Sequence, residues 1–243
     1  MLNKILPPTF NYPVPLIKDI FAKLAGKKVF TTLDLTNAYH RFAVAESDQH
    51  KLTFTHLDGQ QYCFKKACFG LKFLTSQFSK VLAILFDGLD CVQNFVDDAV
   101  IASDSLEQHV KDVRLVIERL NSANLILNTG KCSWAQQSVR LLGFIVDSNG
   151  TRVDKSKLTN VHTFRKAKTA KEVQSILGLV NYFRDYVPMM ARVAEPLTRI
   201  SHAHNVDELW GDEQNKSLDT IKSILQSNLV LSHANMSQRF YCS

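Results

Sequence analysis

Long apolar runs are absent from this chain of 243 residues. The longest one, residues 81–86, is far shorter than the roughly 20 residues that a membrane-spanning helix needs. The N-terminal residues MLNKILPPTF lack the charged and then apolar layout of a secretory signal peptide. We therefore expect a soluble intracellular protein that has no membrane partner.

Cysteine is scarce, and no two cysteines form a C-x-x-C pair. This pattern argues against a disulfide framework and against a zinc site. Repeats and low-complexity tracts are also missing, and 45% hydrophobic with 21% charged residues is an ordinary globular composition. We expect reduced thiols that lie mostly in the core, at Cys63, Cys68, Cys91, Cys132 and Cys242.

The positive charge of the chain is concentrated in one segment. The formal net charge is +6, and residues 151–200 hold ten Lys or Arg but only four Asp or Glu. The rest of the chain is balanced, with 19 residues of each sign. A localised positive field favours a polyanionic partner, most commonly nucleic acid. The alternative is a solvated face of basic helices without a partner.

Strand patterns dominate the first part of the chain, where short β-branched or alternating apolar segments end at Asp, Gly or Asn turns. Asp34 lies near the end of one apolar strand, and Asp97-Asp98 alone separate two others. Asp58-Gly59 and Asn149-Gly150 are typical of hairpin turns. The expected strands are 29–35, 92–96 and 99–102, and the expected hairpins are centred on residues 58–59 and 149–150.

Helical spacing of apolar residues predicts a short helix over 16–24, a long one over 71–89, and another beginning near Asp104. In the last of these, Asp104 is the expected cap and Glu107 the first-turn acid. After residue 154 the strand patterns stop and basic helices begin, punctuated by proline. The expected buried stripes are Leu106, Val110, Val113, Ile117 and Leu120, then Val173, Ile176, Leu177 and Val180, and the punctuating prolines are Pro188 and Pro196.

Three carboxylates stand at the ends of apolar strands: Asp34, Asp97 and Asp98. An isolated charge in an apolar setting costs several kcal/mol unless a partner offsets the desolvation. If the sheet brings these strand ends together, three carboxylates suit two hard divalent cations about 3.5 to 4 Å apart, the arrangement used in phosphoryl transfer. The alternative is that Asp97-Asp98 form an ordinary solvated turn.

Several segments, in this order, resemble the reverse transcriptase of gypsy-type LTR retrotransposons. The body of the resemblance is FTTLDLTNAYHRF at 30–42, CFGLK at 68–72, QNFVDDAVIAS at 93–103 and LLGFIVDSNG at 141–150. LNKILPPTFNYPVPLI near the start, KEVQSILGLVNYFRDYV at 171–187 and EPLTRI at 195–200 extend it over nearly the whole chain. The resemblance implies an α+β fold: a polymerase palm with an antiparallel sheet and helices, then a helical thumb and connection segment.

The resemblance also implies the reaction and the residues that perform it. Asp34, Asp97 and Asp98 match the catalytic, metal-binding triad, with Phe95 where related enzymes more often have Tyr. The triad would hold two Mg²⁺ ions, or Mn²⁺ in their place, for transfer of dNTPs onto a primer. The implied substrate-binding residues are Leu35 through its carbonyl, Tyr39 as the aromatic residue that excludes a ribose 2′-OH, Phe69 and Gly70.

Nucleic-acid contacts are implied as well, with an RNA or DNA template and a DNA primer as partners. A hairpin turn that grips the primer end and three lysines of the basic segment would make these contacts, the lysines through sequence-independent phosphate binding. The residues are Leu142, Gly143 and Phe144 in the turn, and Lys166, Lys168 and Lys171 in the basic segment.

The implied organisation is a palm with partial fingers at 1–150, a thumb-like basic segment at 151–200, and a truncated connection at 201–243. The family's upstream fingers segment and its ribonuclease H domain would lie outside residues 1–243, so we expect weakened polymerase activity and no ribonuclease H activity. After Gly70-Leu71-Lys72, the family continues with Asn, Ala, Pro and a small residue, whereas this chain has Phe73-Leu74-Thr75-Ser76. The resemblance implies that the protein is located in the cytoplasm, free or within a virus-like particle.

Two other functions are alternatives to the polymerase hypothesis. A catalytically silent remnant would bind nucleic acid or a protein partner through the basic helices and would not depend on Asp97. A metal-dependent phosphatase built on Asp34 would need a D-x-D pair, whereas Asp34 is followed by Leu35-Thr36.

Overall fold

The computed structural model describes residues 3, 12–13, 15–36, 38–95, 98–158, 164–227 and 229–232. The chain divides into two compact units, Met1–Val139 and Arg140–Ser243, which are described here one at a time. Within these described stretches, no helix has both the length and the apolar character needed to cross a membrane.

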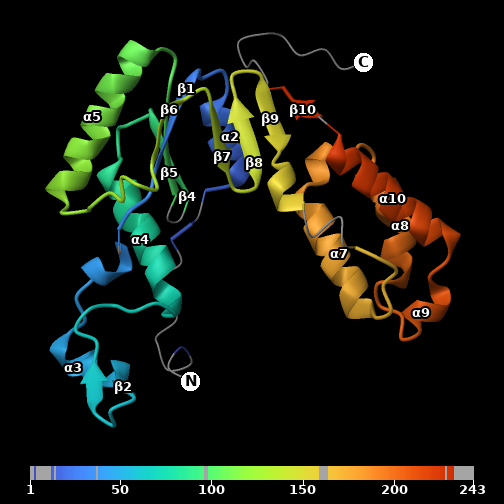
Figure 1. Cartoon of the computed structure of the whole chain (residues 1–243), viewed down its shortest axis with the longest axis horizontal. Helices are drawn as coiled ribbons and strands as arrows, with labels where there is room; N and C mark the ends of the chain where they lie inside the picture. Colours follow the sequence, from blue (N-terminus) through green and yellow to red (C-terminus); the bar gives the residue numbers. More distant parts are fainter. Residues whose placement is uncertain are drawn as a thin grey trace. The chain divides into compact units, whose positions relative to one another are not determined.

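A four-stranded antiparallel sheet forms the centre of the first unit, with the strand order β4-β5-β1-β6 (Figure 1). In the register between β1 and β5, Val29 pairs with Ser103 and Leu33 with Ala99. The apolar, β-branched segments therefore form strands as the sequence predicts, at the two centre positions of the sheet. The bounds are Val29–Leu33 for β1, Val92–Phe95 for β4, Asp98–Ser103 for β5 and Ser133–Gln136 for β6.

Helices α4 (Lys72–Leu85) and α5 (Leu106–Ser122) pack with the sheet in one apolar core, and α2 (Ile17–Leu24) contacts β4. Burial of these faces supplies most of the stability that helices of this length have in water. The side chains that form the core come from β1, α4, β4, β5, α5 and the segments beside them: Leu33, Ala38, Phe78, Leu82, Phe86, Val92, Ala99, Ile101, Val116, Leu120 and Leu125.

Two details of α5 differ from the prediction. The cap is Ser105, whose hydroxyl accepts the backbone N–H of Gln108, rather than Asp104. Leu106 and Val110, predicted to be buried, are exposed, because the face turned to the sheet is centred on His109 and Val116. A rule that counts only apolar residues misplaces this stripe, since a buried histidine occupies one of its positions.

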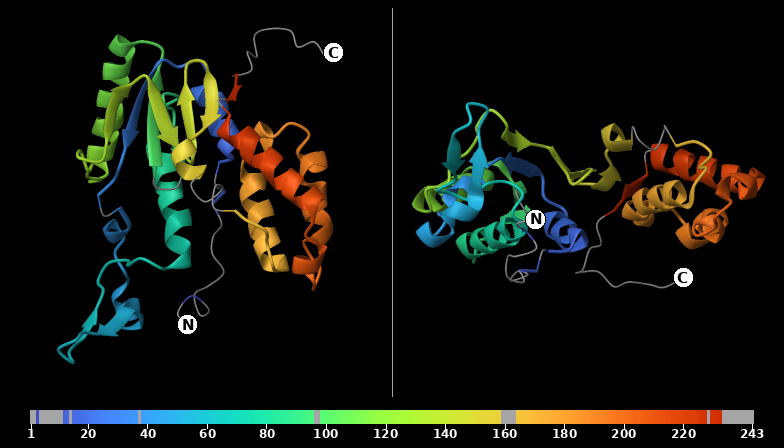
Figure 2. Two further views of the ribbon diagram at one scale, coloured as in Figure 1. Left: turned by 45° about the vertical axis from the view of Figure 1, so that its right-hand side comes forward. Right: turned by 90° about the horizontal axis from the view of Figure 1, so that it is seen from below.

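A small hairpin of the first unit lies apart from the four-stranded sheet in Figures 1 and 2. Its strands pair Thr55 with Gln61, and the N–H of His56 donates to the carbonyl of Gln60 at 2.9 Å. The loop therefore has the three residues 57–59 rather than the predicted two, and Gly59 takes the position with φ +78°. Such a loop needs a residue that tolerates the left-handed region at its third position. The elements here are η1 (Ala38–Arg41), α3 (Glu46–Gln49), η2 (His50–Leu52), β2 (Thr53–Thr55) and β3 (Gln61–Cys63).

The second unit combines a four-stranded sheet, of order β10-β9-β8-β7, with a group of helices in which α8 packs against both α7 and α10 (Figure 2). Of the predicted stripe of α7, Val173, Ile176 and Val180 are buried and Leu177 is half-buried. The strands are β7 (Ser138–Leu141), β8 (Phe144–Asp147), β9 (Gly150–Val153) and β10 (Val230–Leu231), and the helices are η3 (Lys155–Leu158), α7 (Ala170–Tyr182), η4 (Arg184–Tyr186), α8 (Met190–Ile200), α9 (Val206–Leu209) and α10 (Asp212–Gln226).

Two sequence predictions for this unit are wrong in detail, one for the position of a turn and one for a break between helices. Asp147 pairs with Gly150, so Ser148 and Asn149 form the turn and Gly150 begins β9. Pro196 does not separate two helical pieces but lies inside α8. The mixed helices and antiparallel strands of both units nevertheless confirm the predicted α+β class.

The cysteines that the structure describes are free thiols, as expected. Their predicted burial is wrong, because Cys63 is exposed and the other three are half-buried at the edges of apolar clusters. Cys242 lies outside the described residues. The assignment of residues 1–150, 151–200 and 201–243 to palm, thumb and connection stays a prediction.

Candidate functional site

Asp34 and Asp98 are neighbours at the same end of the central strand pair. The register that pairs Leu33 with Ala99 brings Asp34 opposite Asp98 when it is continued by one residue. Directly opposed residues of an antiparallel pair have Cβ atoms about 4.5 to 5.5 Å apart. Asp97, the third predicted carboxylate, lies outside the described residues. Two of the three acids thus meet although 63 other residues separate them in the chain.

Both backbone polar groups of Asp34 are engaged. Its N–H donates to the Cys132 sulfur at 3.4 Å, and its carbonyl accepts the N–H of Asn128 at 2.8 Å. The N–H of Thr36 donates to the carbonyl of Ile126 at 2.7 Å. The loop after α5 therefore fixes the backbone on which the Asp34 carboxylate stands.

These bonds leave Leu35 in the non-hydrogen-bonded position of its bridge with Leu127. Among the described residues, no backbone hydrogen bond is made to the Leu35 carbonyl. A carbonyl oxygen such as that of Leu35 is a ligand of the kind that hard divalent cations accept.

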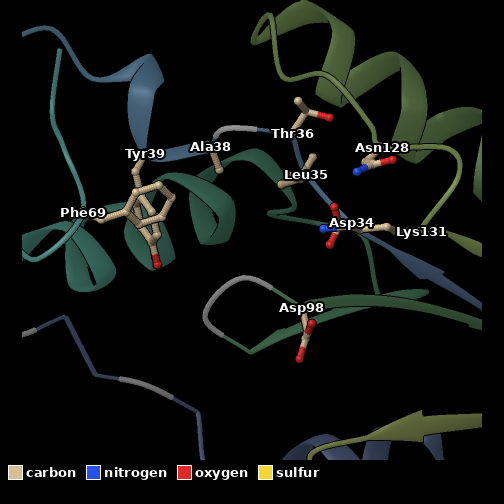
Figure 3. Close-up of a pocket in the computed structure, with 9 residues that line it drawn as sticks. All are labelled: Asp34, Leu35, Thr36, Ala38, Tyr39, Phe69, Asp98, Asn128 and Lys131. Atoms are coloured by element: carbon tan, nitrogen blue, oxygen red, sulfur yellow. The ribbon is translucent and has the colours of Figure 1, made fainter.

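A pocket of about 290 Å³ contains the two carboxylates (Figure 3). The figure shows Asp34 and Asp98 on one side of the close-up and the aromatic rings of Tyr39 and Phe69 on the other. The full lining is Asp34, Leu35, Thr36, Ala38, Tyr39, Phe69, Asp98, Asn128 and Lys131.

Lys131 and Asn128 belong to this pocket and were not predicted from the sequence. Both lie in the loop between α5 and β6, which has no apolar periodicity that would point to a site. Lys131 adds a positive charge to a pocket that otherwise holds two acids. The pocket therefore offers groups both for a cation and for an anionic ligand.

The aromatic side of the pocket is built around Tyr39. Its ring meets Phe69 edge-on with centroids 5.6 Å apart, and Phe78 of the core at the same distance. Phe69 is 68% exposed, so its face is available to a ligand. Tyr39 and Phe69 also line an adjoining pocket of about 280 Å³ that contains Gly70, whose φ of +92° favours glycine. All four predicted substrate-binding positions thus line one or both of these adjoining pockets.

The donor set fits a divalent cation in kind, because two carboxylates and the Leu35 carbonyl are hard oxygen ligands. Within the part of the chain that the structure describes, no cluster of three or more His, Cys, Asp or Glu side chains is assembled. The third carboxylate of the predicted triad would have to come from Asp97, outside that part.

The predicted primer-gripping turn joins β7 to β8 in the second unit. Leu142 and Gly143 both have positive φ, +53° and +79°, which is the geometry of a tight two-residue hairpin turn. Phe144 begins β8 and is buried among Tyr182, Phe183 and Tyr186, with ring centroids 5.4 to 5.6 Å away.

The three predicted phosphate-binding lysines are all exposed in the second unit, but they are not equivalent. Lys166 forms an ion pair with Asp207 at 2.8 Å, which occupies the ammonium group. Lys168 and Lys171 flank the start of α7, where Thr169 and Glu172 form a reciprocal capping box. The stem of Lys157 runs beside Gly143, which makes it an additional basic residue next to the turn.

Residues 1–146 match the family described as Reverse transcriptase (RNA-dependent DNA polymerase). The match covers more than half of the chain and includes both carboxylates of the pocket. The chain belongs to the reverse transcriptase family.

Curated relatives of this reverse transcriptase chain are transposon polyproteins of Schizosaccharomyces pombe. The Tf2-3 polyprotein is 32% identical over 240 residues, and the Tf2-7 polyprotein is 31% identical over the same length. Each alignment covers 98% of this chain but 18% of the relative. The chain therefore corresponds to about a fifth of the length of these polyproteins, and the predicted likeness to an LTR retrotransposon enzyme is confirmed.

Solved structures of foamy viral protease-reverse transcriptase share the fold of this reverse transcriptase chain. The structure in complex with dsDNA has a TM-score of 0.85 and 25% identity, and the match covers 97% of this chain and 49% of that one. A second structure, of the foamy viral protease-reverse transcriptase dRH in complex with ds DNA, has a TM-score of 0.84 at 24% identity, and the match covers 94% of this chain and 41% of that one. The similarity spans both units of the chain.

Proposed function

We propose that this chain performs RNA-directed DNA polymerisation, the template-directed transfer of dNTPs onto a DNA primer, for a retrotransposon. The observation that carries the proposal is the single pocket in which Asp34 and Asp98 face Tyr39, Phe69 and Lys131. Membership of the reverse transcriptase family and the transposon relatives support the same reaction. The foamy viral structures, which contain dsDNA or an RNA/DNA hybrid, support a nucleic-acid duplex as the partner.

Different residues of the pocket would bind the cations, the triphosphate, and the sugar and base. Asp34, Asp98 and the Leu35 carbonyl, completed by Asp97, would hold two divalent cations, Mg²⁺ or Mn²⁺. Bound there, such ions would lower the pKa of the primer 3′-OH and neutralise charge on the departing pyrophosphate. Lys131 lies in the same pocket, where its ammonium group attracts the triphosphate. Tyr39 and Phe69 provide apolar surfaces for the sugar and base.

The remaining assignments follow from this reaction. We propose that residues 1–150 act as a palm with part of the fingers, that 151–200 act as a thumb, and that 201–243 belong to a connection segment. The basic segment would contact phosphates of the primer–template duplex, and the enzyme would act in the cytoplasm or within a virus-like particle.

Primer extension tests the proposal. The chain is incubated with a DNA primer on an RNA template and dNTPs, and we expect extension in Mg²⁺ that stops when EDTA removes the ion and resumes when Mg²⁺ is restored. The same assay is run with this chain and with a longer polyprotein fragment that contains it. If both bind the duplex but neither extends the primer at any Mg²⁺ or Mn²⁺ concentration, the chain is a binding module and the proposal is wrong.

Shortening Tyr39 to Val is expected to relax sugar selection. The ring stands between the carboxylates and the adjoining pocket, so its removal opens space beside the sugar. We expect the ratio of dNTP to rNTP incorporation to fall by about tenfold or more, because each 1.4 kcal/mol of lost discrimination is a factor of ten. Single-nucleotide incorporation kinetics with dTTP and UTP measure the ratio. Tyr62→Val, which shortens an exposed tyrosine on the β2–β3 hairpin, is the control and should leave the ratio unchanged.

A further inference from the structure

Tyr182 holds the turn between β7 and β8. It is the last residue of α7, and its hydroxyl donates a hydrogen bond to the carbonyl oxygen of Leu142 at 2.6 Å. Leu142 is the first of the two turn residues with positive φ. The bond therefore fastens the tip of the hairpin to the end of a helix 40 residues further along the chain.

Packing around the same turn limits its freedom. A Cβ atom built on Gly143 would lie 3.8 Å from the ring of Tyr182 and 4.0 Å from that of Phe183. Phe144 stacks against Tyr186 with ring centroids 5.4 Å apart. Burial raises the pKa of the Tyr182 phenol above its usual value, so this group remains a protonated donor at neutral pH. The contacts hold both sides of the turn.

We propose that Tyr182 is a positioning residue for the primer strand, acting through the Leu142 carbonyl. This inference rests on the proposed function, because it requires the primer–template duplex of that reaction and the primer contact that the family resemblance implies for the Leu142–Gly143 turn. By fixing the turn to α7, Tyr182 makes the turn and the helix one rigid element. The backbone of the turn is then held in one position before the primer arrives, which lowers the ordering cost of binding.

The length of α7 sets the distance between the turn at one end of the helix and the basic residues at the other. Thirteen residues of α-helix span about 20 Å, since each residue rises about 1.5 Å. That length equals about six nucleotide steps of a strand at about 3.4 Å each. The exposed lysines Lys168 and Lys171 lie at the opposite end of the helix from Tyr182. A duplex lying along α7 would therefore meet the turn and the basic end together.

The test compares Tyr182→Phe with Tyr186→Phe. Both variants lose one hydroxyl from the same aromatic cluster, but Tyr186 donates to the Thr151 hydroxyl at 2.8 Å and not to the turn. Amide hydrogen exchange of peptides covering residues 141–144 reports on the turn without requiring activity. Fluorescence anisotropy with a labelled primer–template gives Kd, and steady-state extension gives KM and kcat.

For Tyr182→Phe we expect exchange in the turn to be about threefold to tenfold faster, as for loss of one hydrogen bond. Kd and KM for primer–template should rise by a similar factor, with kcat at saturating primer–template unchanged. Tyr186→Phe should leave turn exchange and KM at wild-type values, although its melting temperature falls because a buried hydrogen bond is lost. A general loss of structure would not produce this split.

Two other outcomes overturn the inference and are distinguishable. If Tyr182→Phe shows wild-type exchange in the turn, or the same Kd and KM as wild type, Tyr182 has no positioning role while the proposed function stands. If the wild-type chain binds no primer–template, the proposed function fails and the role of Tyr182 in primer binding fails with it.

Discussion

Replacing Asp98 by Asn is expected to lower the rate of primer extension on the order of 100-fold or more. The substitution keeps the size and shape of the side chain but removes a negative charge from a pocket where Asp34 is the other described carboxylate. An amide is a poor substitute because divalent cations in nucleotidyl transfer are held mainly by carboxylates. We expect the loss mainly in kcat, measured by single-turnover extension at saturating dNTP and Mg²⁺.

Asp34→Asn should have a similar effect, because Asp34 directly follows β1 and Asp98 begins β5 at the same end of this strand pair. The double variant should lose little more than either single variant, since residues that act as a unit are strongly non-additive. Asp87→Asn, an exposed acid of the first unit outside the pocket, is the matched control and should extend primers at the wild-type rate. Wild-type kcat in Asp98→Asn would show that the pocket is not the catalytic site.

The meeting of Asp34 and Asp98 could be anticipated from the sequence because both interrupt or end apolar strands. Strand patterns alone did not give their pairing, since β1 and β5 are far apart in the chain and the register is set by the fold. The family resemblance supplied that long-range information. The pockets then add what no local pattern contains: Lys131 and Asn128 enter the site from a loop without periodicity.

The wrong burial predictions for α5 also show what a local sequence pattern leaves out. Apolar spacing placed Leu106 and Val110 in the core, whereas both are more than half exposed. The position between them that is buried holds His109, a polar residue that the pattern ignores. Hydrophobic periodicity predicts a helix reliably, but it misplaces the buried face where that face includes a polar residue whose hydrogen bonds are satisfied.

His109 is 2% exposed and joins α5 to the sheet through hydrogen bonds on both ring nitrogens. The Ser103 hydroxyl donates to Asp112 at 2.6 Å, so its oxygen accepts the Nδ1–H of His109 at 2.9 Å. Nε2 is then unprotonated and accepts the Thr31 hydroxyl at 2.7 Å. Thr31 in turn accepts the N–H of Ala135 in β6. This arrangement holds for the neutral ring, which burial favours because it lowers the pKa of His109.

We expect His109→Leu to lower the free energy of unfolding of the first unit by about 2 to 4 kcal/mol at pH 7.5, because it removes one hydrogen bond from each of the buried hydroxyls of Thr31 and Ser103. Ser103 keeps its bond to Asp112 and Thr31 keeps that from Ala135, but the Thr31 hydroxyl loses the acceptor of its proton. Urea unfolding followed by the fluorescence of Trp134, in a Trp210→Phe background, restricts the signal to this unit. His56→Leu, at an exposed position of the β2–β3 hairpin, is the control and should change stability by less than about 0.5 kcal/mol.

The difference between wild type and His109→Leu should narrow as the pH falls. Burial lowers the pKa of His109, and the nearby Asp112 carboxylate offsets this only in part. The unfolded chain therefore binds a proton at about pH 6.5 while the folded chain does not, so wild-type stability is complete above that pH and is lost as the pH falls toward the lowered folded pKa. His109→Leu lacks this titration. Parallel stability curves for wild type and His109→Leu between pH 7.5 and 5 would contradict a neutral, buried His109 as the link between α5 and the strands that carry Asp34 and Asp98.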